Sequence, residues 1–136
     1  MEHIEEKNRS HFMDLFLLAI SDNETDPNEI ELLYNLGFQK GFTKEQIDEI
    51  IANPHKVRFI KPTSLIEAID RLYDLAQMVL ADGIIHPNEI EYCKKIALRF
   101  QIIDKNIIDD LIENLIEEVK KGVDKETLIN QIKKII

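Results

Sequence analysis

The 136-residue sequence has only one cysteine, no tryptophan, and four residues each of glycine and proline. The single thiol, Cys93, excludes an internal disulfide framework and a metal site built from several thiolates. No apolar run approaches 18 residues, and the charged segment 1–10 has no signal-peptide core. We therefore expect a cytoplasmic protein that does not insert directly into a membrane.

Basic side chains are also scarce. Seventeen lysines and arginines stand against 26 acidic residues, which gives a net charge of -9. This balance opposes nucleic-acid binding, which requires a basic patch, and docking on an anionic membrane surface. At 44% hydrophobic, however, the chain is too apolar for an acidic disordered tail. Its length suits a single domain, residues 1–136, able to bury about two thirds of its unfolded surface.

Helical periodicity runs through nearly the whole chain, and convincing strand patterns are absent. Glycine and proline fall between the periodic segments, as helix boundaries require. The pattern predicts an all-α fold, a single compact bundle of about seven helices. The expected helices cover about 8–21, 26–37, 43–53, 64–81, 87–100, 104–121 and 124–136.

Helix starts are marked by capping residues. Asp26 precedes Pro27, which suits the first helical position, and Asp124 precedes the last helix. Thr43 and Ser64 each precede a Gln or Glu by three positions, the pattern of a capping box. The connector 54–62 is partly apolar, so we expect it to lie against the core.

The strongest feature is an internal repeat. Residues 22–31 read DNETDPNEIE and residues 82–91 read DGIIHPNEIE, so six of ten positions are identical at an offset of sixty. The half-repeats cover about 8–54 and 64–118, each a helix, an acidic turn, a helix, a turn and a helix, and a C-terminal helix of about 124–136 follows. Such halves normally pack together to bury their apolar faces. The identical pairs are Asp22/Asp82, Pro27/Pro87, Asn28/Asn88, Glu29/Glu89, Ile30/Ile90 and Glu31/Glu91.

Residues 82–89, DGIIHPNE, fit the pattern D-G-x-I-x-x-x-E and resemble the signature of the TerB-like tellurite-resistance family. The resemblance covers about residues 12–115. The first repeat carries a degenerate copy, with Asn23 in place of the glycine and Thr25 in place of the isoleucine. This departure weakens the equivalence of the two turns.

The resemblance implies an all-helical bacterial protein that binds a divalent cation, calcium, through clustered acidic residues. It also implies a protein partner in membrane-linked stress-response complexes, and a similar domain occurs in a membrane-anchored DnaJ-like co-chaperone. Within the family, it implies a binding or sensing module. The ligands that it indicates here are Asp22, Glu29, Asp82 and Glu89.

A structural interpretation of the same carboxylates stays open. Calcium requires six to eight oxygen ligands, and an EF-hand does not fit, because Pro27 and Leu33 occupy its sixth and twelfth positions. Glu29 and Glu89 each stand at the third helical position, where a carboxylate also caps a helix and complements its dipole. Asp82 with Gly83 also reads as a simple turn.

No catalytic constellation is evident. The chain has no Gly-rich phosphate loop, nucleophile elbow or zinc-binding H-E-x-x-H helix. Cys93 aligns with Leu33, which predicts a buried core residue, and His86 reads as a turn histidine. The sequence thus favours a non-enzymatic TerB-like module with no organic cofactor. The alternative is a metal-free adaptor that binds another protein through a helical or acidic surface.

Overall fold

Seven α-helices and two short 3-10 turns form the regular structure of residues 6–21 and 26–135, the part of the chain that the computed structural model describes. The predicted all-α fold is confirmed. In chain order the elements are α1 (Glu6–Ala19), α2 (Pro27–Gln39), α3 (Lys44–Ala52), η1 (Pro54–Lys56), α4 (Leu65–Leu80), α5 (Pro87–Phe100), η2 (Lys105–Ile107), α6 (Ile108–Lys120) and α7 (Lys125–Ile135).

The predicted caps begin the helices. The side chain of Asp26 accepts a hydrogen bond from the Asn28 amide, with Pro27 in the first turn. Thr43 forms a complete capping box with Gln46 before α3. These contacts satisfy amide groups that have no partner within the helix, so local sequence determines where α2 and α3 start.

Two predicted starts differ in detail. Ser64 caps α4, but the Glu67 carboxylate accepts from the amide and hydroxyl of Thr63, one residue further back than a capping box requires. Asp104 caps a 3-10 turn, η2, and the α-helix begins only at Ile108. A 3-10 turn is a common way for a helix to begin.

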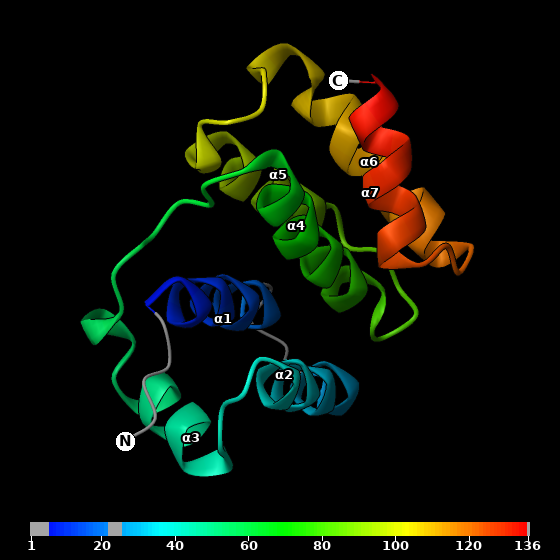
Figure 1. Ribbon diagram of the computed structural model, residues 1–136. Coiled ribbons are helices and arrows are strands. Elements are labelled where there is room, and N and C mark those ends of the chain that lie inside the picture. Colours follow the sequence, from blue (N-terminus) through cyan, green and yellow to red (C-terminus); the bar gives the residue numbers. More distant parts are fainter. Residues whose placement is uncertain (1–5, 22–25, 136) are drawn as a thin grey trace.

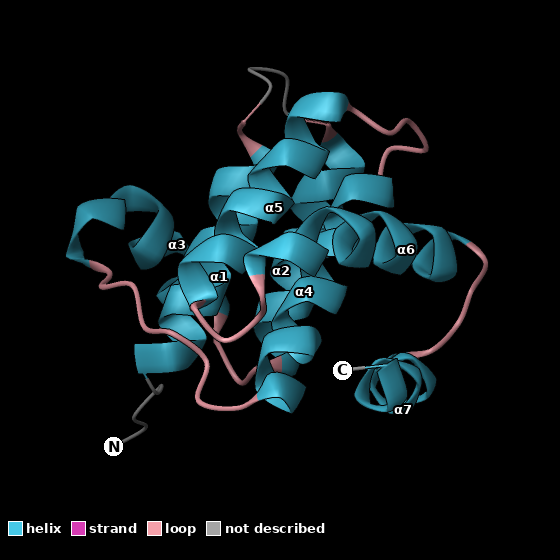
Figure 2. Cartoon of the chain, turned by 90° about the horizontal axis from the view of Figure 1, so that it is seen from above, coloured by secondary structure: helices cyan, strands magenta, loops and turns pink. Residues whose placement is uncertain are grey.

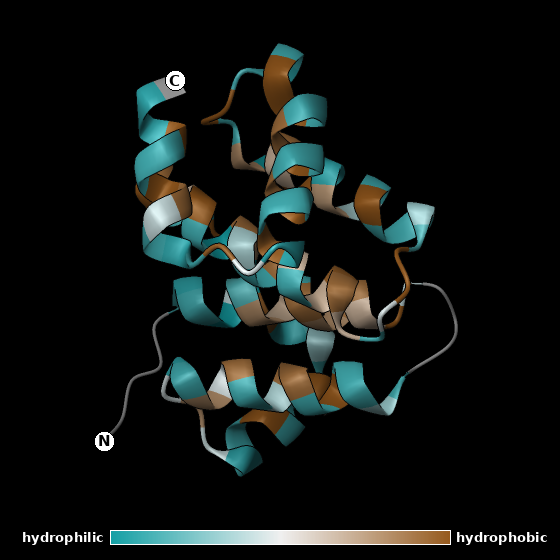
Figure 3. Ribbon diagram, turned by 90° about the vertical axis from the view of Figure 1, so that its right-hand side faces the viewer, coloured by the Kyte–Doolittle hydropathy of each residue, from teal (hydrophilic) through white to brown (hydrophobic). Residues whose placement is uncertain are grey.

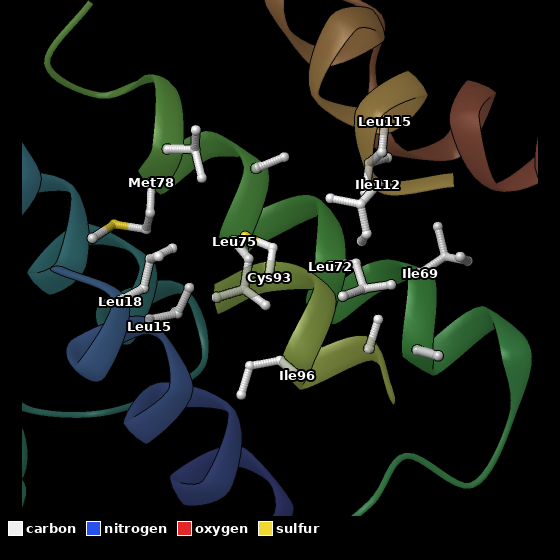
Figure 4. Packing of buried hydrophobic residues seen from close by; sticks show 14 of the residues in the cluster. Leu15, Leu18, Ile69, Leu72, Leu75, Met78, Cys93, Ile96, Ile112 and Leu115 are labelled. Carbon is white, nitrogen blue, oxygen red and sulfur yellow. The ribbon is translucent and has the colours of Figure 1, made fainter. Parts of the chain in front are cut away.

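The central helix is α4, with the first three helices on one side and the last three on the other (Figure 1). Apolar segments lie on the inner faces of the helices and polar segments on the outer faces (Figure 3). Figure 4 shows the core from close by, where Leu15 and Leu18 of α1 lie near Leu75 and Met78 of α4. Cys93 of α5 is buried in the same core, as predicted.

The connector between α3 and α4 packs on the core through Val57 and Phe59, as its apolar residues predict. The last helix, α7, lies at the edge of the helical bundle (Figure 2) and buries Leu128 and Ile132. Among the described helices, none combines the length and the apolar character needed to cross a membrane.

Candidate functional site

The two glutamates of the acidic turns are completely buried. Glu29 is 1% exposed on the first turn of α2, and Glu89 is 0% exposed on the first turn of α5. An acid in the first turn of a helix normally faces water, where it complements the helix dipole at little cost. Burying a carboxylate is expensive unless it gains strong compensating interactions. These two side chains are thus more than exposed helix caps.

Asp82 organises the second acidic turn. One carboxylate oxygen accepts from the Ile84 amide at 2.9 Å, and the other lies 3.0 Å from His86 Nε2. Partial burial opposes ionisation, but these two hydrogen bonds outweigh it and hold the pKa of Asp82 below 3.8. Asp82 is therefore ionised at neutral pH. Its counterpart in the first turn, Asp22, lies outside the described residues.

The helices that follow the two turns are buried in the same way. Residues 26–39 and 86–99 agree at every position in whether the side chain is buried, intermediate or exposed. The duplication itself stays a prediction, and this agreement supports it. The second turn also approaches the first half of the chain, because Gly83 and Ile85 share a cavity of about 410 Å³ with Leu32 of α2.

The four predicted metal ligands are not seen as one cluster. Within residues 6–21 and 26–135, no three His, Cys, Asp or Glu side chains are grouped so that they could hold a metal ion. Asp22 is not among those residues, so the four-carboxylate site stays a prediction. The structure does show Glu29 and Glu89 buried, and the hydrogen bonds of the second turn lower the pKa of Asp82.

No protein family, curated protein or solved structure matches this chain. The TerB-like resemblance consequently rests on the motif of residues 82–89 and its degenerate first copy.

A second polar cluster, which the sequence analysis did not single out, lies between the two central helices. His11 Nε2 of α1 lies 2.8 Å from Asp74 Oδ2 of α4, and both side chains are buried. Lys125 Nζ of α7 lies 3.1 Å from Asp74 Oδ1 and 2.6 Å from Asp70 Oδ1. Asp74 thus ties α1, α4 and α7 together.

The charges of this cluster follow from its surroundings. Burial lowers the pKa of His11 and outweighs the attraction of Asp74, so the imidazole is neutral at pH 7 and donates through Nε2. Burial opposes ionisation of Asp74, but the hydrogen bond from His11 and the charge of Lys125 hold its pKa below 3.8. The result is a buried carboxylate with two donors.

Asp14 stands sixty residues before Asp74 in the sequence and is also buried, at 3% exposure. Its Oδ2 atom has no hydrogen-bond partner among the described residues. Burial raises the pKa of Asp14 to about 7, although the charges of Arg71 and Arg99 pull it down. At pH 7, Asp74 is therefore ionised, whereas Asp14, sixty residues earlier in the sequence, is about half protonated.

The sequence signal that points to this cluster is the offset of sixty residues between the two predicted half-repeats. It aligns Asp14 with Asp74 and His11 with Arg71, so that each half places a basic residue three positions before an aspartate. These polar residues stand among the buried residues of α1 and α4. Cys93, by contrast, is buried as predicted, and burial raises the pKa of its thiol to about 12.

Proposed function

We propose that this chain is a non-enzymatic, TerB-like binding module that takes up a divalent cation, calcium, at its acidic turns. The observation that carries the proposal is the complete burial of Glu29 and Glu89 at matching positions of α2 and α5. Buried charges in proteins are paired or coordinate metals. The TerB-like signature of residues 82–89 favours ligands over simple helix caps.

Asp82 and Asp22 complete the proposed ligand set. Asp82 is ionised, and each oxygen of a carboxylate has two lone pairs, so a hydrogen bond to Ile84 or His86 leaves one available for a cation. Turn carbonyls and water would supply the remaining oxygens that calcium requires. The module would sense or transmit cation binding to a protein partner, within a membrane-linked stress-response complex as the resemblance implies.

Thermal unfolding and calorimetry with calcium, magnesium and EDTA test the cation site. At 100 times its dissociation constant, calcium is expected to stabilise the protein by about 2.7 kcal/mol. The double variant Asp82→Asn with Glu89→Gln should lose this shift. Glu91→Gln, which changes an exposed acid on the same helix, should retain it. A calcium shift no larger than that of magnesium, or one that survives the double variant, would show the assignment to be wrong.

A groove between α5 and α6 favours the second candidate, a metal-free adaptor. It has a volume of about 540 Å³, with Ile85, Ile90 and Ile116 in its apolar part and Glu113 and Glu117 among its polar residues. An apolar groove with acidic sides suits a basic amphipathic helix. Binding of a synthetic Lys/Leu amphipathic peptide that persists in EDTA and weakens with Glu117→Lys would support the adaptor. EDTA-sensitive binding would favour the cation-dependent module.

A further inference from the structure

A cavity of about 330 Å³ opens beside Asp14, away from the acidic turns. Ser10, Asp14 and Leu17 of α1 line one side, the connector from Pro54 to Phe59 lines another, and Arg99 of α5 completes it. The cavity thus brings together three segments that are far apart in the sequence. A pocket of this size is at the lower end of the range for small-molecule sites.

Two charged side chains of the cavity, Asp14 and Arg99, make few polar contacts with the described residues. Asp14 is 97% buried, since its exposure is 3%, yet its Oδ2 atom accepts no hydrogen bond from the described residues. Arg99 lies with its guanidinium carbon 3.8 Å from the centre of the Phe59 ring. Within the described chain, Arg99 forms no ion pair with a carboxylate. Asp14 and Arg99, one acidic and one cationic side chain, therefore line the same small space.

Asp74 shows what a buried aspartate at this position accepts. There the ammonium group of Lys125 lies 3.1 Å from the carboxylate, and His11 donates a second hydrogen bond. Asp14 has no such ammonium among the described residues, and it has the cavity instead. An ammonium group supplied by a ligand would give Asp14 the partner that Asp74 obtains from α7.

The remaining walls define the rest of the ligand. Met13, Leu17 and Val57 present apolar surface in the cavity, together with the ring of Phe59. The positive charges of Arg71 and Arg99 act on Asp14 and would repel a simple amine. A ligand that also carries a carboxylate removes this repulsion, because the carboxylate can pair with Arg99. Arg58 at the same cavity is already engaged by Glu6 at 2.7 Å.

We propose that this cavity binds a free apolar α-amino acid, with its ammonium on Asp14, its carboxylate on Arg99 and its side chain against Leu17, Val57 and Phe59. This site is independent of the acidic turns and of their cation.

Calorimetric and NMR titration of the full chain with L-leucine, L-methionine and L-phenylalanine, up to about 10 mM, tests the site. At least one is expected to bind and to shift the signals of the cavity residues. For the amino acid that binds, the analogue without an ammonium (4-methylpentanoate for leucine) and the analogue without a carboxylate (3-methylbutylamine for leucine) should each bind about ten- to a hundredfold more weakly, since each loses a charge-assisted hydrogen bond.

Two variants test the roles proposed for the charges of Asp14 and Arg99. Asp14→Asn and Arg99→Gln should each weaken amino-acid binding by about ten- to a hundredfold, whereas Lys95→Gln, at an exposed position on α5, should leave it unchanged. Circular dichroism confirms that each variant is folded. The proposal is overturned if none of the three amino acids binds the wild-type chain, or if binding survives Asp14→Asn and Arg99→Gln. Calcium binding at the turns should not respond to either substitution.

Discussion

Replacing Asp74 with alanine is expected to lower the free energy of unfolding by about 3–5 kcal/mol, the range seen when one partner of a buried ionic contact is removed. The carboxylate accepts from His11 at 2.8 Å and pairs with Lys125 at 3.1 Å, so its loss deprives α1 and α7 of a shared anchor on α4. Lys125 keeps Asp70, but His11 keeps no acceptor for its buried N–H group.

Urea unfolding at pH 7 measures this loss, and Asp110→Ala, at an exposed position on α6, is the matched control with a change of about 0.5 kcal/mol or less. The pH dependence provides a second check. Because the folded-state pKa of Asp74 lies below 3.8, its contribution is present above that pH and is lost as the pH falls through the folded-state pKa. A variant as stable as the control would contradict the anchoring role.

Replacing Asp14 with asparagine is expected to act in the opposite direction and stabilise the protein at pH 8. Burial raises the folded-state pKa from 3.8 to about 7, so between these values the folded chain binds more protons than the unfolded chain. Stability therefore falls as the pH rises through this window. A tenfold change in proton affinity corresponds to about 1.4 kcal/mol. The destabilisation of the folded chain by ionised Asp14 therefore approaches about 4 kcal/mol above pH 7. The neutral amide of asparagine avoids that cost.

The gain from Asp14→Asn should shrink as the pH is lowered from 8 and nearly vanish below about pH 3, where aspartate is largely protonated in both states. Urea unfolding at several pH values measures it, with Asp110→Asn as a control whose effect should stay small throughout. A gain that does not depend on pH would mean that ionisation of Asp14 is not its cause. A residue that costs stability in this way is typical of a binding site, where function and stability conflict.

The features predicted best from the sequence are those decided by neighbours in the chain. Asp26, Thr43 and Asp124 cap their helices as expected, because each needs only an amide two or three residues further on. The long apolar periodicity likewise predicted the all-α fold. Helix ends were less exact, because α1 already includes Glu6, ahead of the predicted start near residue 8.

The candidate sites were harder to predict because burial depends on distant segments. Glu29 and Glu89 were identified, but their sequence position fits an exposed cap as well as a ligand, and only the packed structure places both in the interior. Asp14 and His11 lie on α1, beside its wide apolar stripe. A polar residue at the border of such a stripe is expected to face solvent, so the sequence does not show that these two side chains are buried. Their surroundings come from α4, α5 and the connector, which sequence periodicity does not place.

The contact between His11 and Asp74 joins residues 63 positions apart, and this separation bears on how the chain folds during synthesis. Proteins emerge from the ribosome N-terminal end first. The residues of α1, α2 and α3 are therefore synthesised while α4 is still inside the ribosome or not yet translated. Until α4 follows, the Leu15 and Leu18 face of α1 lacks its main covering helix (Figure 4). Lys125 arrives later still. The nascent chain therefore gains its central contacts only after α4 has emerged, and the contacts of α7 only after α6 has followed.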